Sequence, residues 1–104
     1  MGTHIDRPLV SVIMPAYNAE KYIAEAISSV LSQSYTNWQL LILDDCSTDH
    51  TAEIAEYFEK ADTRIRVLRN PRNMGVAKTR NRGIDMAKGE RVALPDSDAR
   101  WHDD

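Results

Sequence analysis

Two aspartates near the end of the chain, Asp96 and Asp98, have a type and spacing that suggest chemistry. They follow the apolar run of residues 91–95, and in an extended backbone residues i and i+2 point to the same side. Two carboxylates so close repel each other unless a cation or hydrogen-bond donors meet them. The triplet therefore fits a site for a divalent metal and phosphate, or else an acidic surface turn, since Asp and Ser are common in turns.

The elements that must position this triplet alternate along the chain. Strand-like and helix-like patterns follow one another, and Pro15 is expected to stop the first strand because proline cannot donate to a sheet ladder. The order predicts an α/β fold: a Rossmann-like, largely parallel sheet of about four strands with helices on both faces. The expected strands are 9–14, 38–43, 65–69 and 91–95, and the expected helices are about 20–32, from the polar cluster 46–49 to about 61, and 76–87.

Spacing also predicts which helix faces turn inward. Residues three and four apart form apolar stripes on all three helices, and the third stripe contains Arg80. Lys78 and Arg82 fall outside that stripe and are expected in solvent. The stripes are Ile23, Ile27, Val30 and Leu31, then Ile54, Tyr57, Phe58 and Ala61, then Ala77, Arg80, Ile84 and Ala87.

In a parallel α/β sheet all the carboxyl ends of the strands lie along one rim, where ligands bind. Carboxylates from separate strands that meet there would repel unless cations or donors offset their charge. This convergence favours the metal and phosphate site over a solvated acidic turn. The rim residues would be Pro15, Ala16, Tyr17, Asp44, Asp45, Asp96 and Asp98.

Two further residues allow a functional and a structural interpretation. Tyr17 could stack on a base at the rim, or pack against the first helix. Arg80 could reach the rim to contact a nucleotide or to brace Asp45, or could extend along the helix edge into water, as long side chains do.

Composition narrows the class of protein. The chain has 104 residues, 42% hydrophobic and 28% charged, with a formal net charge of -3 and no basic block, which argues against binding nucleic acid. No apolar run approaches the ~18 residues of a membrane span. The lone Cys46 fits a reducing, cytoplasmic compartment. The expected organisation is a tail at 1–8 and one domain at 9–104.

Three segments taken together resemble a known family. They are "VSVIMPAYNAEKYIAEAISSVLSQSYTNWQLLILDDCSTDHT", "NMGVAKTRNRGIDMAKGE" and "LPDSDARW", and their order covers nearly all of the chain after Pro8. The chain resembles the donor-binding part of family 2 glycosyltransferases, the inverting nucleotide-sugar enzymes with a GT-A fold. The fold and the activity of that family are therefore expected here.

The resemblance also implies roles for single residues on the base side of the nucleotide. Pro15 would belong to the nucleotide site, and Ala16 and Tyr17 would flank uracil or another base. Asp45 would hydrogen-bond a ring nitrogen, and Arg80 would help to hold the base side. A UDP-sugar is the expected donor.

On the phosphate side the resemblance implies a metal. Asp96 would lie near the ribose and diphosphate and share the metal site, and Asp98 of this DXD motif would carry Mg²⁺ or Mn²⁺, which prefer hard oxygen ligands. Many relatives add another Asp where this chain has Ala99, so Asp98 would serve without that neighbour and bind metal more weakly.

The chain stops at Asp104, before the position where the family carries its acceptor pocket and catalytic base. We therefore expect residues 9–104 to be a domain that is incomplete at its C-terminus and transfers nothing alone. Its parent would act on an acceptor sugar, lipid or polysaccharide and would not bind nucleic acid. The alternative is a non-catalytic nucleotide-binding module, or one that self-associates through an exposed sheet edge. A nucleotidylyltransferase fits less well, because "PAYN" lacks its Gly-rich phosphate loop.

Overall fold

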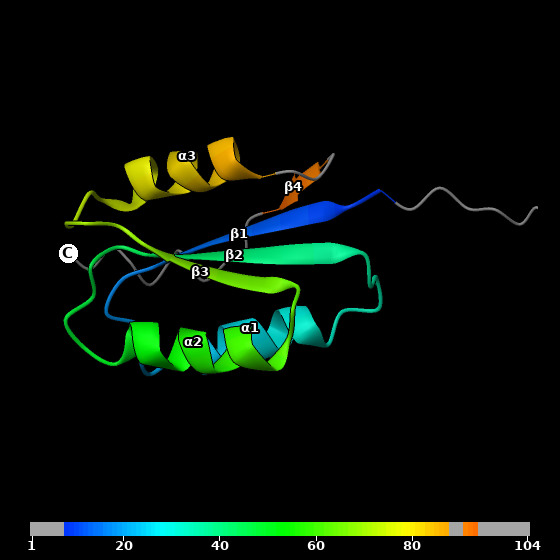
Figure 1. Cartoon of the computed structure of the whole chain (residues 1–104), viewed down its shortest axis with the longest axis horizontal. Helices are drawn as coiled ribbons and strands as arrows, with labels where there is room; N and C mark the ends of the chain where they lie inside the picture. The colour runs from blue at the N-terminus through cyan, green and yellow to red at the C-terminus, as the bar shows by residue number, and fades with distance from the viewer. Residues whose placement is uncertain (1–7, 88–90, 94–104) are drawn as a thin grey trace, which may run out of the picture.

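The computed structural model describes residues 8–87 and the backbone of 91–93. Four parallel strands form one sheet in the order β3-β2-β1-β4, with α1 and α2 on one face and α3 on the other (Figure 1). This confirms the predicted α/β architecture. The strands are β1 Val10–Ala16, β2 Trp38–Asp44, β3 Ile65–Arg69 and β4 Arg91–Ala93, and the helices are α1 Ile23–Leu31, α2 Thr51–Ala61 and α3 Val76–Met86.

The central strand β2 is apolar along nearly its whole length because helices cover both faces of the sheet. Leu40 and Ile42 belong to the hydrophobic cluster packed under α1 and α2. The alternate residues Leu41 and Leu43 pack with Ile13 on the other face, toward α3. The near-continuous hydrophobic pattern therefore reports burial on two sides rather than one.

Pro15 lies inside β1, where it is paired opposite Leu43, so the expectation that it stops the strand is wrong. The carbonyl of the next residue, Ala16, accepts a hydrogen bond from the N–H of Asp45 on the β2 side, at 2.8 Å. Because successive residues of a strand bond to opposite sides, the nitrogen of Pro15 faces the β4 side. The described pairing with β4 ends at Val12, so Pro15 interrupts no ladder bond to the described part of β4.

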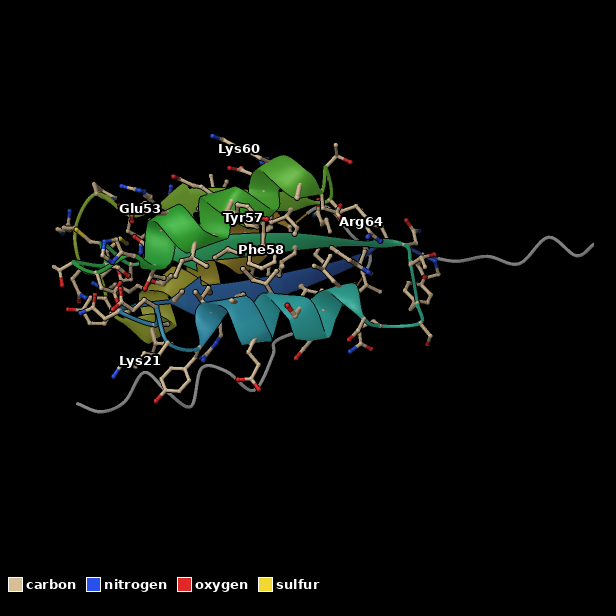
Figure 2. The ribbon with its side chains drawn as sticks, turned by 90° about the horizontal axis from the view of Figure 1, so that it is seen from below. Lys21, Glu53, Tyr57, Phe58, Lys60 and Arg64 are labelled. Carbon is tan, nitrogen blue, oxygen red and sulfur yellow. The ribbon has the colours of Figure 1, made fainter. Side chains whose placement is uncertain are left out.

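The inner face of α1 agrees with its predicted stripe, since Ile23, Ile27 and Val30 are buried. The stripe of α2 is only partly right. Phe58 packs against the core, whereas Tyr57 is 71% exposed. Figure 2 shows both side chains from the side of the sheet that α1 and α2 cover. Ala61 is exposed as well, because the buried face of α2 runs through Thr51, Ala52 and Ala55 instead.

The predicted stripe of α3 is wrong. Thr79 and Gly83 are the buried residues of this helix, while Ala77 and Ile84 are exposed. A Cβ atom on Gly83 would lie 2.5 Å from Cγ2 of Ile13 and 2.8 Å from Cδ1 of Leu43. The helix therefore approaches the sheet through its smallest residue, which apolar spacing does not identify.

At one edge of the sheet, two outward-facing polar groups of β3 are hydrogen-bonded by side chains. The N–H of Val67 donates to Oε2 of Glu59 from α2 at 3.0 Å. The carbonyl of Arg69 accepts from Nη1 of Arg82 on α3 at 3.3 Å. Side chains from both faces of the sheet thus occupy backbone positions that would otherwise be open to another strand.

At the end of the sheet opposite the rim, Arg64 stacks over Trp38 with its guanidinium carbon 3.8 Å from the ring centroid (Figure 2). Its Nη2 is also 2.8 Å from Oδ2 of Asp62, and this contact lowers the pKa of Asp62. Stacking and an ion pair therefore cover this end of the sheet. Within the described residues, no helix is both long and apolar enough to cross a membrane.

Candidate functional site

The loops that leave β1, β2 and β3 gather at one end of the sheet, on the left in Figure 1, as expected for a parallel sheet. Asp45 is the first residue after β2 and lies at this rim. It is fully buried on the α3 side of the sheet. Its backbone N–H bonds to Ala16, so the ends of β1 and β2 meet as predicted.

The carboxylate of Asp45 accepts three hydrogen bonds from the 70–75 loop. Its Oδ1 accepts from the N–H of Met74 at 2.7 Å and from Nδ2 of Asn70 at 2.8 Å. Its Oδ2 accepts from the N–H of Gly75 at 2.9 Å. Gly75 has a φ of 90°, a backbone conformation that glycine adopts without steric cost. Asp45 therefore holds the β3–α3 loop against the rim, and a buried carboxylate is retained because donors surround it.

Asn70 connects this carboxylate to α3. Its Nδ2 donates both to Asp45 and, at 2.8 Å, to Oγ1 of the buried Thr79. Its Oδ1 accepts a hydrogen bond from Nη1 of Arg82. The expectation that Arg82 is solvated is therefore wrong: the residue is half-buried and bonded to the loop.

Asp44, the last residue of β2, points to the opposite face from Asp45. It is 2% exposed, and its Oδ2 accepts from the N–H of Ser47 at 3.1 Å. Its Oδ1 is buried and has no hydrogen-bond partner among the residues that the structure describes. The two adjacent aspartates thus occupy different environments because side chains alternate across a strand.

The loops after β1 and β2 are joined by reciprocal hydrogen bonds. The N–H of Asn18 donates to Oγ of Ser47, and Oδ1 of Asn18 accepts from the N–H of Thr48, both at 2.8 Å. Asn18 has a φ of 47°, in the left-handed region that Asn tolerates better than most residues. Asn18 therefore fixes the loop that carries Tyr17.

A second connection lies at the start of α2. The hydroxyl of Thr51 accepts from the N–H of Ala19 at 2.7 Å and donates to Oδ1 of Asp49 at 2.5 Å. Burial raises the pKa of Asp49, but hydrogen bonds from the hydroxyl and N–H of Thr51 and from the N–H of Glu20 outweigh it, so the net pKa is lowered. The carboxylate of Asp49 thus favours its ionised form and accepts the N–H of Thr51, the first residue of α2, at 2.9 Å.

Glu20 and His50 make an exposed pair beside the start of α2. Oε1 of Glu20 is 3.0 Å from both the N–H and Nδ1 of His50. The backbone N–H of His50 is the main cause of the lowered pKa of Glu20, and the side-chain hydrogen bond to Glu20 raises the pKa of His50. The pair is strongest where both groups are charged.

The structure brings most of the predicted site residues to the rim. Pro15 and Ala16 are buried at the end of β1, and Tyr17 is half-buried directly after it. Asp45 follows β2, and Arg80, half-buried on α3, is next to Thr79 of the Asn70 network. Their proposed roles toward a nucleotide remain predictions.

The predicted metal residues Asp96 and Asp98 lie outside the described residues. Among residues 8–87, no three His, Cys, Asp or Glu side chains come together in a way that could hold a metal ion. Residues that the sequence did not single out include Asn70, Thr79 and the amides of Met74 and Gly75. The polar, turn-rich composition of the 70–75 loop is the signal for the loop residues, and Thr79 on α3 has no such signal in the sequence.

Comparison with known proteins places the chain in a family. The family described as Glycosyl transferase family 2 matches residues 11–104. TuaG of Bacillus subtilis is 48% identical over 98 residues, which cover 94% of this chain and 39% of TuaG. The UDP-Glc:alpha-D-GlcNAc-diphosphoundecaprenol beta-1,3-glucosyltransferase WfgD of Escherichia coli is 46% identical, over 93% of this chain and 38% of WfgD.

Solved structures agree with this assignment. S. aureus TarS 1-349 in complex with UDP-GlcNAc is 38% identical and has a TM-score of 0.76, over 82% of this chain and 25% of that one. A mannosyltransferase from Pyrobaculum calidifontis, solved with GDP-Man and Mn2+, shares the fold at 24% identity and a TM-score of 0.77, over 95% of this chain and 33% of that one.

The fold and the matches together define a GT-A architecture. The chain belongs to glycosyl transferase family 2. It spans between 26% and 39% of the length of the curated relatives that it matches.

Proposed function

We propose that this chain is the donor-binding part of a glycosyltransferase that takes its sugar from a nucleoside diphosphate, with a UDP-sugar as the first candidate. The observation that carries the proposal is the rim itself, where Ala16, Tyr17 and Asp45 converge at the carboxyl ends of two parallel strands. The 38% identity to TarS, whose structure contains UDP-GlcNAc, supports the same class of ligand.

The base would bind between the loop after β1 and the loop after β2. Tyr17 offers an aromatic face for stacking, which is worth ~1–3 kcal/mol per base in nucleic-acid complexes. Asp45 offers an acceptor for a ring N–H, and Arg80 on the neighbouring helix would approach the base side. Asn18 keeps the Tyr17 loop in place through its bonds to Ser47 and Thr48.

The phosphates would need a positive charge beside them, and Asp96 and Asp98 would be the ligands of the metal ion that provides it. Two carboxylates form a hard donor set that suits Mg²⁺ or Mn²⁺ beside phosphate oxygens. When bound, such an ion offsets the charge that develops on the departing nucleoside diphosphate. The residues of this chain would hold the ion and orient the donor.

The complete reaction would be an inverting transfer to an acceptor hydroxyl of a sugar, lipid or polysaccharide. In that reaction the hydroxyl oxygen attacks the anomeric carbon, its proton passes to a base, and the nucleoside diphosphate leaves. Because the chain spans only 39% of TuaG and 38% of WfgD, we expect it alone to bind donor weakly and to transfer nothing. A cytoplasmic site, at the membrane face for a longer parent, would fit the lone Cys46.

Titration calorimetry with UDP, GDP and CDP, with and without Mn²⁺, tests this proposal on the 104-residue chain. We expect UDP to bind with Mn²⁺ present, and Asp98→Ala to weaken that binding about tenfold, equivalent to about 1.4 kcal/mol. Asp85→Ala, on the exposed side of α3, is the matched control and should change nothing. Absence of nucleotide binding would refute the function, and binding indifferent to Mn²⁺ would refute the metal site.

The self-associating module is the weaker alternative. Glu59 and Arg82 already bond outward groups of β3, which makes that edge a poor template for a second copy. Size-exclusion chromatography with light scattering should therefore give a monomer at micromolar concentration. A stable dimer that Glu59→Ala strengthens would favour assembly through this edge.

A further inference from the structure

We propose that Asn70 and Arg82 are positioning residues that orient the Asp45 carboxylate and thereby set the base preference of the site. The inference rests on the proposed function, and it adds two residues that would not touch the nucleotide. It follows from how the hydrogen bonds around Asp45 are distributed and from what each partner can donate.

An ionised carboxylate accepts at about four positions, two on each oxygen. Asn70 and Met74 occupy both positions on Oδ1 of Asp45, and Gly75 occupies one on Oδ2. One position on Oδ2 therefore has no donor among the residues that the structure describes. Because a carboxylate only accepts, that position suits the ring N–H of uracil, thymine or guanine and opposes the unprotonated ring nitrogen of cytosine or adenine.

The side-chain amide of Asn70 determines whether Oδ1 of Asp45 is satisfied. In the observed orientation both hydrogens of Nδ2 are used, one by Asp45 and one by Thr79. Rotating the amide by half a turn would place its oxygen against the oxygens of Asp45 and Thr79. The base preference therefore depends on one orientation of this amide.

Arg82 selects that orientation. A guanidinium has donors only, so it bonds the oxygen of the Asn70 amide and would repel the NH₂ group in the rotated state. Asn70 is 3% exposed and Thr79 is fully buried, so water has little access to replace a hydrogen-bond partner lost by the Asn70 amide. Arg82 is half-buried at the edge of this network, which makes it replaceable without opening the core.

The test is the ratio of UDP to CDP affinity, measured by calorimetry on Arg82→Ala and Asn70→Ala. We expect a loss of about tenfold in UDP affinity and little change for CDP, since CDP gains nothing from the acceptor position in the unmodified chain. Arg82→Lys keeps one donor and should restore part of the ratio. Lys78→Ala on α3 and Arg72→Ala on the same loop remove exposed positive charges and should leave the ratio unchanged.

Folding is checked by thermal unfolding of each variant, and the Asn70 orientation by NMR in the absence of nucleotide. The side-chain NH₂ of Asn70 should exchange slowly in the unmodified chain and in Lys78→Ala, and faster in Arg82→Ala. An unchanged UDP to CDP ratio in folded Arg82→Ala, or an equal loss for both nucleotides, would overturn the inference while leaving the proposed function intact. Failure of the unmodified chain to bind any nucleotide would instead refute the function, and unprotected Asn70 hydrogens in that chain would independently refute the positioning role.

Discussion

Polar side chains hold the loops on both sides of the rim, but they are buried on one side and exposed on the other. On the α3 side, Asp45 is fully buried and accepts three hydrogen bonds from one loop. On the α1 and α2 side, Asn18 joins Ser47 and Thr48 through contacts that are exposed to solvent. The comparison teaches that polar side chains fix both loops, but only the buried set is protected from competition by water.

The largest expected effect comes from removing the buried acceptor. Asp45→Ala would leave two backbone N–H groups and the Asn70 amide without their partner, so we expect it to lower the free energy of unfolding by about 3 kcal/mol. Asp44→Ala removes only the bond to Ser47 together with an oxygen that has no described partner, so about 1 kcal/mol is expected. Urea denaturation of both variants measures the difference, and equal losses would remove the distinction between the two sides.

A smaller loss is expected where α3 meets the sheet. Gly83→Ala would place a methyl group 2.5 Å from Cγ2 of Ile13, and such overpacking costs about 2 kcal/mol. Asn81→Ala, on the exposed side of the same helix, is the control and should be neutral or slightly stabilising, because Ala favours helix. Thermal and urea unfolding report the change. A Gly83→Ala variant as stable as the parent would show that the α3 side can relax.

The smallest effect belongs to the exposed pair of Glu20 and His50. The raised pKa of His50 gives stability that is full below its ordinary value of 6.5 and is lost as the pH rises through the folded pKa. The lowered pKa of Glu20 gives stability that is present above its ordinary value of 4.5 and is lost as the pH falls through the folded pKa. The pair should therefore contribute most between these two values.

His50→Gln should lower the melting temperature slightly near pH 5.5, and the difference from the unmodified chain should shrink toward pH 9. Thermal unfolding across this range in low salt measures it, because salt screens exposed charges. His50 and Glu20 side chains are 77% and 38% exposed, so the shift should remain small. A difference that grows with pH would contradict the assignment.

Much of the fold could be predicted from the alternation of strand and helix patterns. The bounds of β3 agree with its predicted range, and the inner face of α1 agrees with its spacing. The errors arose where a rule based on local sequence, such as proline ending a strand or apolar residues facing inward, was overridden by tertiary packing. Pro15 is tolerated inside β1 because its nitrogen faces away from β2, and α3 turns Gly83 inward because only a glycine allows so close an approach.

The position of the candidate site in the fold could be predicted, but the hydrogen-bond partners of its residues could not. The rule that strand ends share a rim located Asp45 and Tyr17 correctly. It could not pair Asp45 with Asn70, because those residues are 25 positions apart and polar residues in loops have no periodicity that reveals their partners. For the same reason the sequence assigned Arg82 to solvent, although it bonds Asn70 and the backbone of Arg69.

The side chains that bond the outer border of β3 also determine how this architecture can be enlarged. Glu59 reaches Val67 from one layer of helices and Arg82 reaches Arg69 from the other, so an incoming segment would have to displace both. In a larger protein, any additional strand of this sheet is therefore expected to pair at the β4 edge and not at the β3 edge.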